Sequence, residues 1–320
     1  MKKIDLIVPC YNTHKTLYRL FGSIMSQNCK DEIHVILVDD CSDETYDEIV
    51  KPFQNIIDIE IVRLKKNSGP GTARRVGMQK GKSKYIMFID SDDTFFNAFS
   101  VERLLYEIES RQCDIVYSNF LEDLDNNKFL MHDNDHIWVF GKIFKRQFLE
   151  NFSIYFNDTR SNEDNGFNTL TRCFTEPQYV NETTYIWHHN PNSITRINNG
   201  LYTFTCMEGQ IENKIWAFTE GYKRGWKREF YITNIIGQFC YYYFNYFNIK
   251  SQTREEVKPE LYLQWVKRYY EQFKDEIKEA IEQGLLQEAY KSNFISYYNN
   301  FDNILVQDIT INEFIDLLKK

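Results

Sequence analysis

The sequence lacks features that mark several common classes of protein. Acidic residues outnumber basic ones by 46 to 38, giving a net charge of −8, so no nucleic-acid-binding face is expected. The seven cysteines show no Cys-x-x-Cys spacing, which argues against a zinc site or a disulfide framework. The first apolar run is too short for a signal peptide. These absences together favour a cytoplasmic globular protein with reduced thiols.

A dinucleotide-binding motif is also missing. The first predicted strand, 4–8, leads into Pro9-Cys-Tyr-Asn12 and not into Gly-x-Gly-x-x-Gly, which counts against a Rossmann domain. Three more buried runs alternate with predicted helices. Asp43 is the expected N-cap of the helix that starts at residue 44. The pattern predicts a doubly wound α/β domain with a mostly parallel sheet flanked by helices. The predicted strands are 4–8, 33–38, 59–64 and 85–89, and the helices are 14–27, 44–50 and one from about 72.

Three carboxylates follow the fourth predicted strand, at Asp90, Asp92 and Asp93. Ligands of open α/β sheets bind outside the carboxyl ends of the strands. Acidic groups clustered there repel one another unless a cation lies among them, and Mg²⁺ or Mn²⁺ binds carboxylates together with substrate phosphates. The pattern therefore predicts a metal–diphosphate site. The alternative is a solvated acidic turn that caps the next helix.

Polar groups at the other strand ends suggest a nucleoside pocket. Tyr11 offers an aromatic face for a base, and Asp39 offers an acceptor for a base N–H group. Arg74 lies in the first turn of a helix, where it could meet a base carbonyl or a phosphate. A surface aromatic, a cap and a solvated arginine are the respective alternatives. Because all three should converge on one edge of the sheet, they favour a nucleoside-diphosphate pocket.

The motifs that carry these groups resemble the ordered motifs of family 2 glycosyltransferases, which use nucleotide sugars and have the GT-A fold. The resemblance covers roughly residues 1–200, and the sequence departs from the family pattern at Cys41 and Arg75. The matching segments are Val8–Asn12, Val38–Asp43, Asn67–Arg74, Phe88–Asp93, Gly141–Arg146, Asn162–Asn165 and Trp187–Thr195.

The resemblance implies a donor site for a nucleoside-diphosphate sugar, with a UDP-sugar expected. Asp92 would hold the Mn²⁺ or Mg²⁺ ion, with Asp90 and His189 as further ligands. The donor would be bound by Pro9, Tyr11, Asn12, Asp39, Asp40, Gly71, Arg74, Asp90 and Ser91.

A general base is the second requirement of glycosyl transfer, since the acceptor hydroxyl loses its proton as it attacks the anomeric carbon. The resemblance assigns this role to Asp164, with Glu163 as a neighbouring acceptor contact, and implies single-displacement transfer with inversion. The structural alternative is that Asp164 caps a helix that starts at Asn165.

Acceptor contacts are less clearly marked. The resemblance places Trp138 and the segment 142–146 on the acceptor side, although core packing is the commoner use of a single tryptophan. His188 and His189 lie on a predicted strand, 184–189, and therefore point to opposite faces. His188 is a further candidate for the acceptor side.

Residues 201–320 form a second, mainly helical region beyond the catalytic domain of residues 1–200. Residues 230–249 carry no charge. Their length would allow a membrane span, but their polar residues favour a buried helix with one apolar stripe. A basic cluster at 223–228 leaves peripheral contact with an anionic membrane open. We expect this region to serve acceptor binding, homo-oligomeric assembly or membrane-surface contact. Its predicted stripe is Ile232, Ile235, Ile236, Phe239 and Tyr243.

The sequence thus predicts a metal-dependent glycosyltransferase acting on a glycan, lipid-linked or protein acceptor. One alternative is a sugar-phosphate nucleotidyltransferase, which would need a glycine-rich basic loop where Pro9–Asn12 stands. The other is a nucleotide-sugar-binding relative without catalysis, which would tolerate loss of the Asp90–Asp92 or Glu163–Asp164 motifs. Both motifs are intact.

Overall fold

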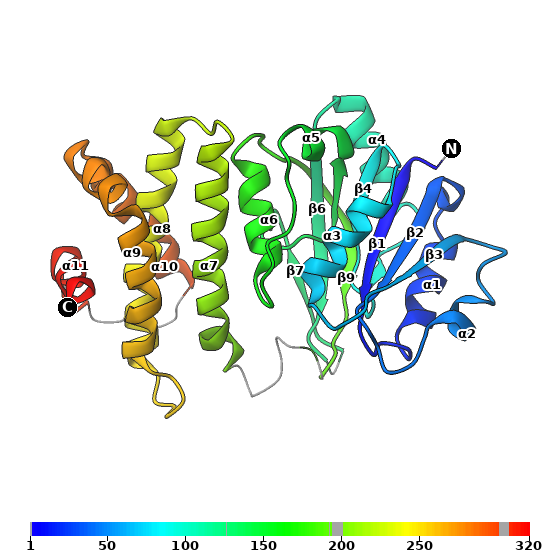
Figure 1. Cartoon of the computed structure of the whole chain (residues 1–320), viewed down its shortest axis with the longest axis horizontal. Coiled ribbons are helices and arrows are strands. Elements are labelled where there is room, and N and C mark those ends of the chain that lie inside the picture. The colour runs from blue at the N-terminus through cyan, green and yellow to red at the C-terminus, as the bar shows by residue number, and fades with distance from the viewer. Residues whose placement is uncertain (1, 126, 192, 194–200, 301–306) are drawn as a thin grey trace. The chain divides into compact units, whose positions relative to one another are not determined.

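The computed structural model describes residues 2–125, 127–191, 193, 201–300 and 307–320. The chain divides into two compact units, Met1–Pro191 and Asn192–Lys320 (Figure 1). The first unit is built on a sheet, and the second consists of helices. All seven cysteines are free, as the sequence predicts.

A nine-stranded sheet organises the N-terminal unit. Its strand order is β3-β2-β1-β4-β8-β6-β9-β5, with β7 paired to β6. The strands are β1 (Ile4–Cys10), β2 (Ile33–Asp39), β3 (Asp58–Arg63), β4 (Tyr85–Phe88), β5 (Thr94–Phe95), β6 (Ile115–Asp123), β7 (Phe129–His132), β8 (Lys142–Lys145) and β9 (Gln178–Trp187).

The first four strands are parallel, which confirms the predicted α/β architecture. β1 lies between β2 and β4, and β2 pairs with β3. Beyond β4 the sheet continues through β8, which is antiparallel to both β4 and β6, while β6 and β9 are parallel. β4 and β8 run in opposite directions, so β8 begins at the edge of the sheet where β4 ends.

Helices cover both faces of this sheet because its buried strands alternate apolar side chains between them. On one face, Leu6 and Leu37 belong to a core shared with α1 (Leu17–Met25) and α4 (Ser100–Arg111). On the other face, α3 (Pro70–Lys80) packs on β1 and β2 (Figure 1). A Cβ on Gly77 would lie 2.5 Å from Ile7, so only glycine allows this close approach.

The helix predicted at 44–50 is shorter than expected. α2 spans Asp47–Val50, and Tyr46 precedes it in place of Asp43. Asp43 instead exchanges two hydrogen bonds with Asn12, at 2.9 and 3.0 Å, which ties the loop after β2 to the loop after β1. The predicted cap was wrong because this contact across 31 residues competes with local capping.

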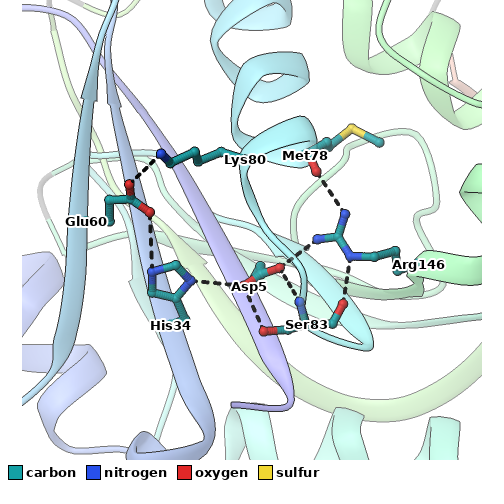
Figure 2. A network of polar contacts seen from close by, with 7 residues as sticks. All are labelled: Asp5, His34, Glu60, Met78, Lys80, Ser83 and Arg146. Carbon is teal, nitrogen blue, oxygen red and sulfur yellow. Dashed lines mark hydrogen bonds and ion pairs between the residues drawn. The ribbon is translucent and has the colours of Figure 1, made fainter. Parts of the chain in front are cut away.

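A buried polar network lies at the amino ends of the parallel strands (Figure 2). Asp5 of β1 accepts hydrogen bonds from Arg146 at 2.6 Å and from the Ser83 amide at 2.7 Å, and His34 lies 3.1 Å away. Arg146 also donates to the carbonyls of Ser83 and Met78. Arg146 begins α5 (Arg146–Asn151). These bonds lower the pKa of Asp5 despite its burial.

The C-terminal unit consists of helices packed around α8. The predicted apolar stripe of α8 is confirmed, since all five of its residues are buried, and α8 packs on α9 and α10 within this unit. The helices are α7 (Tyr202–Lys223), α8 (Arg228–Ser251), α9 (Pro259–Glu282), α10 (Leu285–Asn300) and α11 (Ile311–Lys319).

Buried tyrosines in this unit keep their hydroxyl groups hydrogen-bonded, as buried phenols require. Tyr262 donates to the Tyr242 carbonyl and Tyr269 to the Ile235 carbonyl, both at 3.0 Å. Of the helices in the described residues, none is long and apolar enough to cross a membrane. In the basic cluster, Arg224 pairs with Glu220, which reduces the positive charge of that surface.

Candidate active site

Three parallel strands deliver the predicted site residues to one edge of the sheet. Cys10 at the end of β1 lies opposite Asp39 at the end of β2. β4 ends at Phe88, two residues before Asp90. The structure therefore brings together the strand ends that the sequence singled out, at the position where ligands of open α/β sheets bind.

The two carboxylates after β2 have different partners. Asp39 accepts a hydrogen bond from the Ser42 amide at 2.8 Å and pairs with Arg63 at the end of β3. Asp40 accepts hydrogen bonds at 2.7 Å from the amides of Ser68 and Gly69. Both acidic residues are buried. Asp40 therefore fixes the loop that opens α3.

The remaining residues predicted near the donor differ in accessibility. Tyr11 is 48% exposed, so its ring is accessible for stacking. Asn12 is held by Ser42 and Asp43. Pro9 and Ser91 are buried. Among these four residues, Tyr11 therefore offers the largest accessible side chain.

Arg74 joins the two halves of the predicted site. Its guanidinium donates to Asp90 and to Glu163, each at 2.7 Å, and its side chain is only 6% exposed. The two carboxylates raise the pKa of Arg74. Glu163 is the first residue of α6 (Glu163–Arg172). The bridge thus connects the turn after β4 with the helix that carries the predicted base.

Gly71 allows this approach of α3 to α6. A Cβ at this position would lie 2.8 Å from the Glu163 Cγ and 3.0 Å from the Asn157 carbonyl. A side chain here would push Glu163 away from Arg74. The role supported by the geometry is close packing, since glycine has no Cβ to obstruct the approach.

The acidic turn after β4 is held from several sides. Asp93 is buried, with Tyr185 Oη donating to one carboxylate oxygen at 2.6 Å and the His188 amide to the other at 2.8 Å. Asp92 is half-buried and accepts a hydrogen bond from the Asn190 side chain at 2.8 Å. Burial and neighbouring carboxylates raise the pKa of both acids, the situation that a bound cation relieves.

The two histidines after β9 occupy different positions. His188 Nε2 lies 2.8 Å from Thr94 Oγ1. Burial and Arg19 lower its pKa to about 4, so it is neutral near pH 7. His189 is half-buried. Of the segment 187–195 that carries the family resemblance, residues 192, 194 and 195 lie outside the described part of the chain.

The donor set around Asp92 fits a divalent cation that shares its ligands with a substrate. Among the described residues no group of three His, Cys, Asp or Glu side chains could hold a metal ion alone. Mg²⁺ and Mn²⁺ sites commonly use one or two carboxylates and fill the remaining positions with phosphate and water. The half-buried carboxylate of Asp92 at the sheet edge suits that arrangement.

Asp164 is the second residue of α6, and its carboxylate accepts a hydrogen bond from the Asn165 amide at 2.7 Å. Burial and the adjacent Glu163 raise its pKa to about 7, while Arg74 opposes the shift. Asp164 nevertheless remains partly exposed. A carboxylate that is accessible and titrates near neutrality is suited to proton transfer.

The predicted acceptor segment is divided by the structure. Trp138 is half-buried and packs beside Trp187, with ring centroids 4.8 Å apart. Lys142 begins β8 at the site edge, but Arg146 lies at the opposite end of the sheet, beside Asp5. The prediction was wrong for Arg146 because the strand between them carries the chain across the sheet.

Three residues at the site were missed by sequence reasoning. Tyr185 holds Asp93, Asn190 binds Asp92, and Arg19 donates to the Asp92 carbonyl. Each acts across more than 70 residues of sequence. Arg19 and Tyr185 lie outside the family motifs, and Asn190 lies within the matching segment Trp187–Thr195 but was not among the predicted site residues.

Fold and site together define an α/β transferase domain of the GT-A type. The family model described as "Glycosyl transferase family 2" matches residues 5–162. The relatives include an uncharacterized glycosyltransferase EpsJ of Bacillus subtilis, 29% identical over 68% of this chain and 70% of EpsJ. The family model thus covers most of the N-terminal unit, and residues 5–162 are those of a glycosyl transferase family 2 domain.

A second relative carries a more specific name. The poly(ribitol-phosphate) beta-N-acetylglucosaminyltransferase TarS of Staphylococcus aureus is 28% identical over 69% of this chain, but the match spans only 39% of TarS. The crystal structure of TarS residues 1–349 in complex with UDP-GlcNAc has a TM-score of 0.71 and 18% identity, covering 97% of each chain. This likeness confirms the fold.

Proposed function

We propose that the protein transfers a sugar from a UDP-sugar to an acceptor hydroxyl with inversion. The observation that carries the proposal is the Arg74 bridge, which joins Asp90 of the donor half to Glu163, the neighbour of Asp164. A donor bound at the strand ends would thereby lie next to a partly exposed carboxylate with a raised pKa. The family match supports the same chemistry.

The donor would occupy the edge formed by the ends of β1, β2 and β4. Tyr11 would stack on the base, and Asp39, already oriented by Arg63 and Ser42, would accept from a base N–H group. Arg74 holds Asp90 in place for the ribose and its neighbouring groups. UDP-N-acetylglucosamine is the first donor to test, because TarS, which shares the fold, was crystallised with it.

Asp164 would remove the proton of the acceptor hydroxyl as its oxygen attacks the anomeric carbon. Glu163 is held by Arg74 and raises the pKa of Asp164, so the base is tuned toward neutral pH. Inversion follows from a single displacement with the base on the face opposite the leaving group.

Asp92 would hold Mn²⁺ or Mg²⁺ together with phosphate oxygens of the donor. Asp90 and His189 remain further candidate ligands, but with Asp92 they do not form a metal site by themselves in the described part of the chain. Such an ion supplies charge neutralisation to the departing nucleoside diphosphate. Tyr185 and the His188 amide hold Asp93, and through it the turn that carries Asp92.

The acceptor and the C-terminal unit belong to the same proposal. A glycan, a lipid-linked sugar or a protein could present the hydroxyl, and a polyol-phosphate polymer is the first class to test given the TarS relation. The catalytic region would extend to about residue 200. The helices from residue 201 onward would serve acceptor binding, assembly or membrane-surface contact.

The test is release of nucleoside diphosphate from UDP-, GDP- and dTDP-sugars, with water as acceptor. Each sugar is incubated with Mn²⁺, Mg²⁺ or EDTA, and wild type is compared with Asp92→Ala. We expect turnover of one UDP-sugar that needs metal and is lost in the variant. Calorimetric binding of a UDP-sugar without turnover in any condition would instead favour a non-catalytic relative. If the protein neither binds nor turns over any of the sugars, the proposal is refuted.

A further inference from the structure

Helices cover both faces of the parallel half of the sheet, but the part formed by β6, β7 and β9 has an open face. On the covered side, Phe120 and Val180 lie in the core that α4 shares, and α4 packs on β6 and β9. On the other side, Asn181 is exposed and Met131 is 43% exposed. We call this second surface the open face. The proposed mechanism gives it no role.

Aromatic and apolar side chains extend across all three strands of the open face. Tyr117 of β6 and Tyr179 of β9 lie side by side, with ring centroids 5.4 Å apart. Thr183 Oγ1 of β9 lies 3.5 Å from the sulfur of Met131 of β7, which places both residues on this face. Phe129 lies two residues before Met131 on the same strand and therefore shares its face. Its ring is 55% exposed.

A hydrogen-bonded cluster of amides lies among these rings. Asn119 is buried, and its Oδ1 accepts from the Tyr179 hydroxyl at 2.7 Å and from the Asn134 backbone amide at 3.0 Å. Its Nδ2 donates to Asn181 Oδ1 at 3.0 Å, and the Tyr117 hydroxyl donates to Asn134 Oδ1. The two exposed asparagines, Asn134 and Asn181, accept through Oδ1, which leaves their Nδ2 groups as donors for a ligand. The buried amide fixes the positions of these donors in advance.

The strands of the open face lead to the acidic turn of the proposed donor site. β6 and β9 are parallel and end at Asp123 and Trp187. The residue after β9, His188, donates a hydrogen bond from its amide to Asp93. An extended ligand that follows these strands would therefore reach the turn that carries Asp92.

The helix with the proposed base borders the same face. The Tyr117 ring contacts the His136 ring edge-on, with centroids 6.0 Å apart. Arg172, in the last turn of α6, lies 2.6 Å from the same imidazole. The first turn of α6 carries Asp164. The open face thus adjoins the elements that carry both halves of the proposed active site.

Charge narrows the class of ligand that the open face can bind. The side chains that form it are uncharged, and the charged residues at the ends of β6 and β7 are of both signs: Asp123, Lys128 and Asp133. Arg172, at its border, contacts His136. Phosphate groups are recognised by arginine or lysine, and the open face presents no cluster of them. Rings and amides instead match the C–H faces and the hydroxyl groups of an uncharged sugar.

We propose that the open face is an acceptor subsite that binds an uncharged glycan. The proposal rests on the proposed function, because it names the class of acceptor for that reaction. Phe129 and Tyr179 stack on sugar residues of this glycan, and Asn134 and Asn181 donate to its hydroxyl groups. The polyol-phosphate polymer suggested by the TarS relation is expected to bind this face more weakly.

The test measures binding of chitohexaose, cellohexaose, maltohexaose and poly(ribitol phosphate) by calorimetry in the presence of UDP. Asn181→Ala removes a donor from the open face. Asn151→Ala is the matched control, because this exposed asparagine ends α5, which begins beside Asp5 at the opposite edge of the sheet. We expect one of the three oligosaccharides to bind wild type. Its affinity should fall about fivefold in Asn181→Ala, the loss expected for one hydrogen bond, and stay unchanged in Asn151→Ala.

A second variant excludes an indirect effect, because Asn181 also accepts from the buried Asn119. Phe129→Ala removes an exposed ring outside the amide cluster and should weaken binding of the same oligosaccharide severalfold. Hydrogen exchange followed by mass spectrometry then locates the ligand on wild type. Amides of residues 129–131 and 179–183 should exchange more slowly with the oligosaccharide bound.

Three results would overturn the proposal. Wild type could bind none of the three oligosaccharides, or both variants could bind as tightly as wild type. Protection confined to other segments would place the ligand elsewhere. Tighter binding of poly(ribitol phosphate) than of any oligosaccharide, weakened by both variants, would refute the uncharged class.

Failure of the proposed function is recognised separately, because wild type would then hydrolyse no nucleotide sugar. Oligosaccharide binding and hydrogen exchange remain measurable in that case. Binding at the open face without hydrolysis would show a glycan site in a protein that is not a transferase. Hydrolysis without binding of any oligosaccharide would refute the acceptor subsite and leave the proposed function in place.

Discussion

At each end of the parallel sheet an arginine pairs with a buried carboxylate, Asp5 at one end and Glu163 at the other, but the two arginines differ in their other partners. At the amino ends, three of the Arg146 nitrogens donate to Asp5, Ser83 and Met78 (Figure 2). At the carboxyl ends, Arg74 bridges Asp90 and Glu163, while its Nε has no hydrogen-bond partner among the described residues.

The difference extends to protonation. The pKa of Asp5 is lowered by its partners, whereas those of Asp92, Asp93 and Asp164 are raised by burial and by neighbouring carboxylates, Asp90 among them. A fully satisfied network stabilises a fold, and an excess of buried charge of one sign marks a place prepared for a ligand or a proton. This contrast supports our proposal that the catalytic site lies at the carboxyl ends of the strands.

The largest expected effect concerns the base. Asp164→Asn keeps the size of the side chain but removes its ability to accept a proton. We expect kcat for donor hydrolysis to fall about 10³-fold, with UDP affinity measured by calorimetry unchanged. A variant that retains more than a tenth of wild-type kcat would show that another group takes the proton.

A matched pair of arginine variants compares the two ends directly. Arg146→Met and Arg74→Met each leave buried carboxylates without their cation, so each should lower the free energy of unfolding by about 3 kcal/mol. Only Arg74→Met should also weaken UDP-sugar binding. The measurements are denaturant unfolding and calorimetry. Equal loss of donor affinity in both variants would contradict the claim that only the carboxyl ends of the strands bind the donor.

A smaller effect is expected for the hydroxyl that holds the acidic turn. Tyr185→Phe removes the hydrogen bond to Asp93 and should weaken binding of UDP with Mn²⁺ about fivefold, in line with about 1 kcal/mol for one hydrogen bond. Tyr262→Phe is the control, because its hydroxyl is equally buried but lies in the C-terminal unit. Similar affinities in the two variants would remove Tyr185 from the site.

Much of the candidate site at the carboxyl ends of the strands could be predicted from the sequence. Buried parallel strands that lead to Asp39 and Asp90 must place both residues at one edge of the sheet. Arg74 was predicted from its place in the first turn of a helix, and the family motifs added Asp164 as the base. The partners of these groups were not predictable, since the Arg74–Glu163 pair joins residues 89 positions apart.

The polar network at the amino ends of the strands could not be predicted from the sequence, for the same physical reason. Asp5 and Arg146 are 141 positions apart, and each looks like an ordinary surface residue within its segment. The antiparallel strands β6 and β8 were also missed, because their short buried runs lack a distinctive period. One signal was overlooked: Thr310 and Glu313 form a capping box that begins α11.

The pH dependence of donor hydrolysis tests the central claim most directly. The base works when ionised, so activity should rise as pH increases through the pKa of Asp164, which burial and Glu163 raise to about 7. The account predicts a rising limb of kcat/KM with its midpoint near pH 7. A midpoint near pH 4, the ordinary range of an aspartate, would contradict the claim that charge is left uncompensated at this end of the sheet.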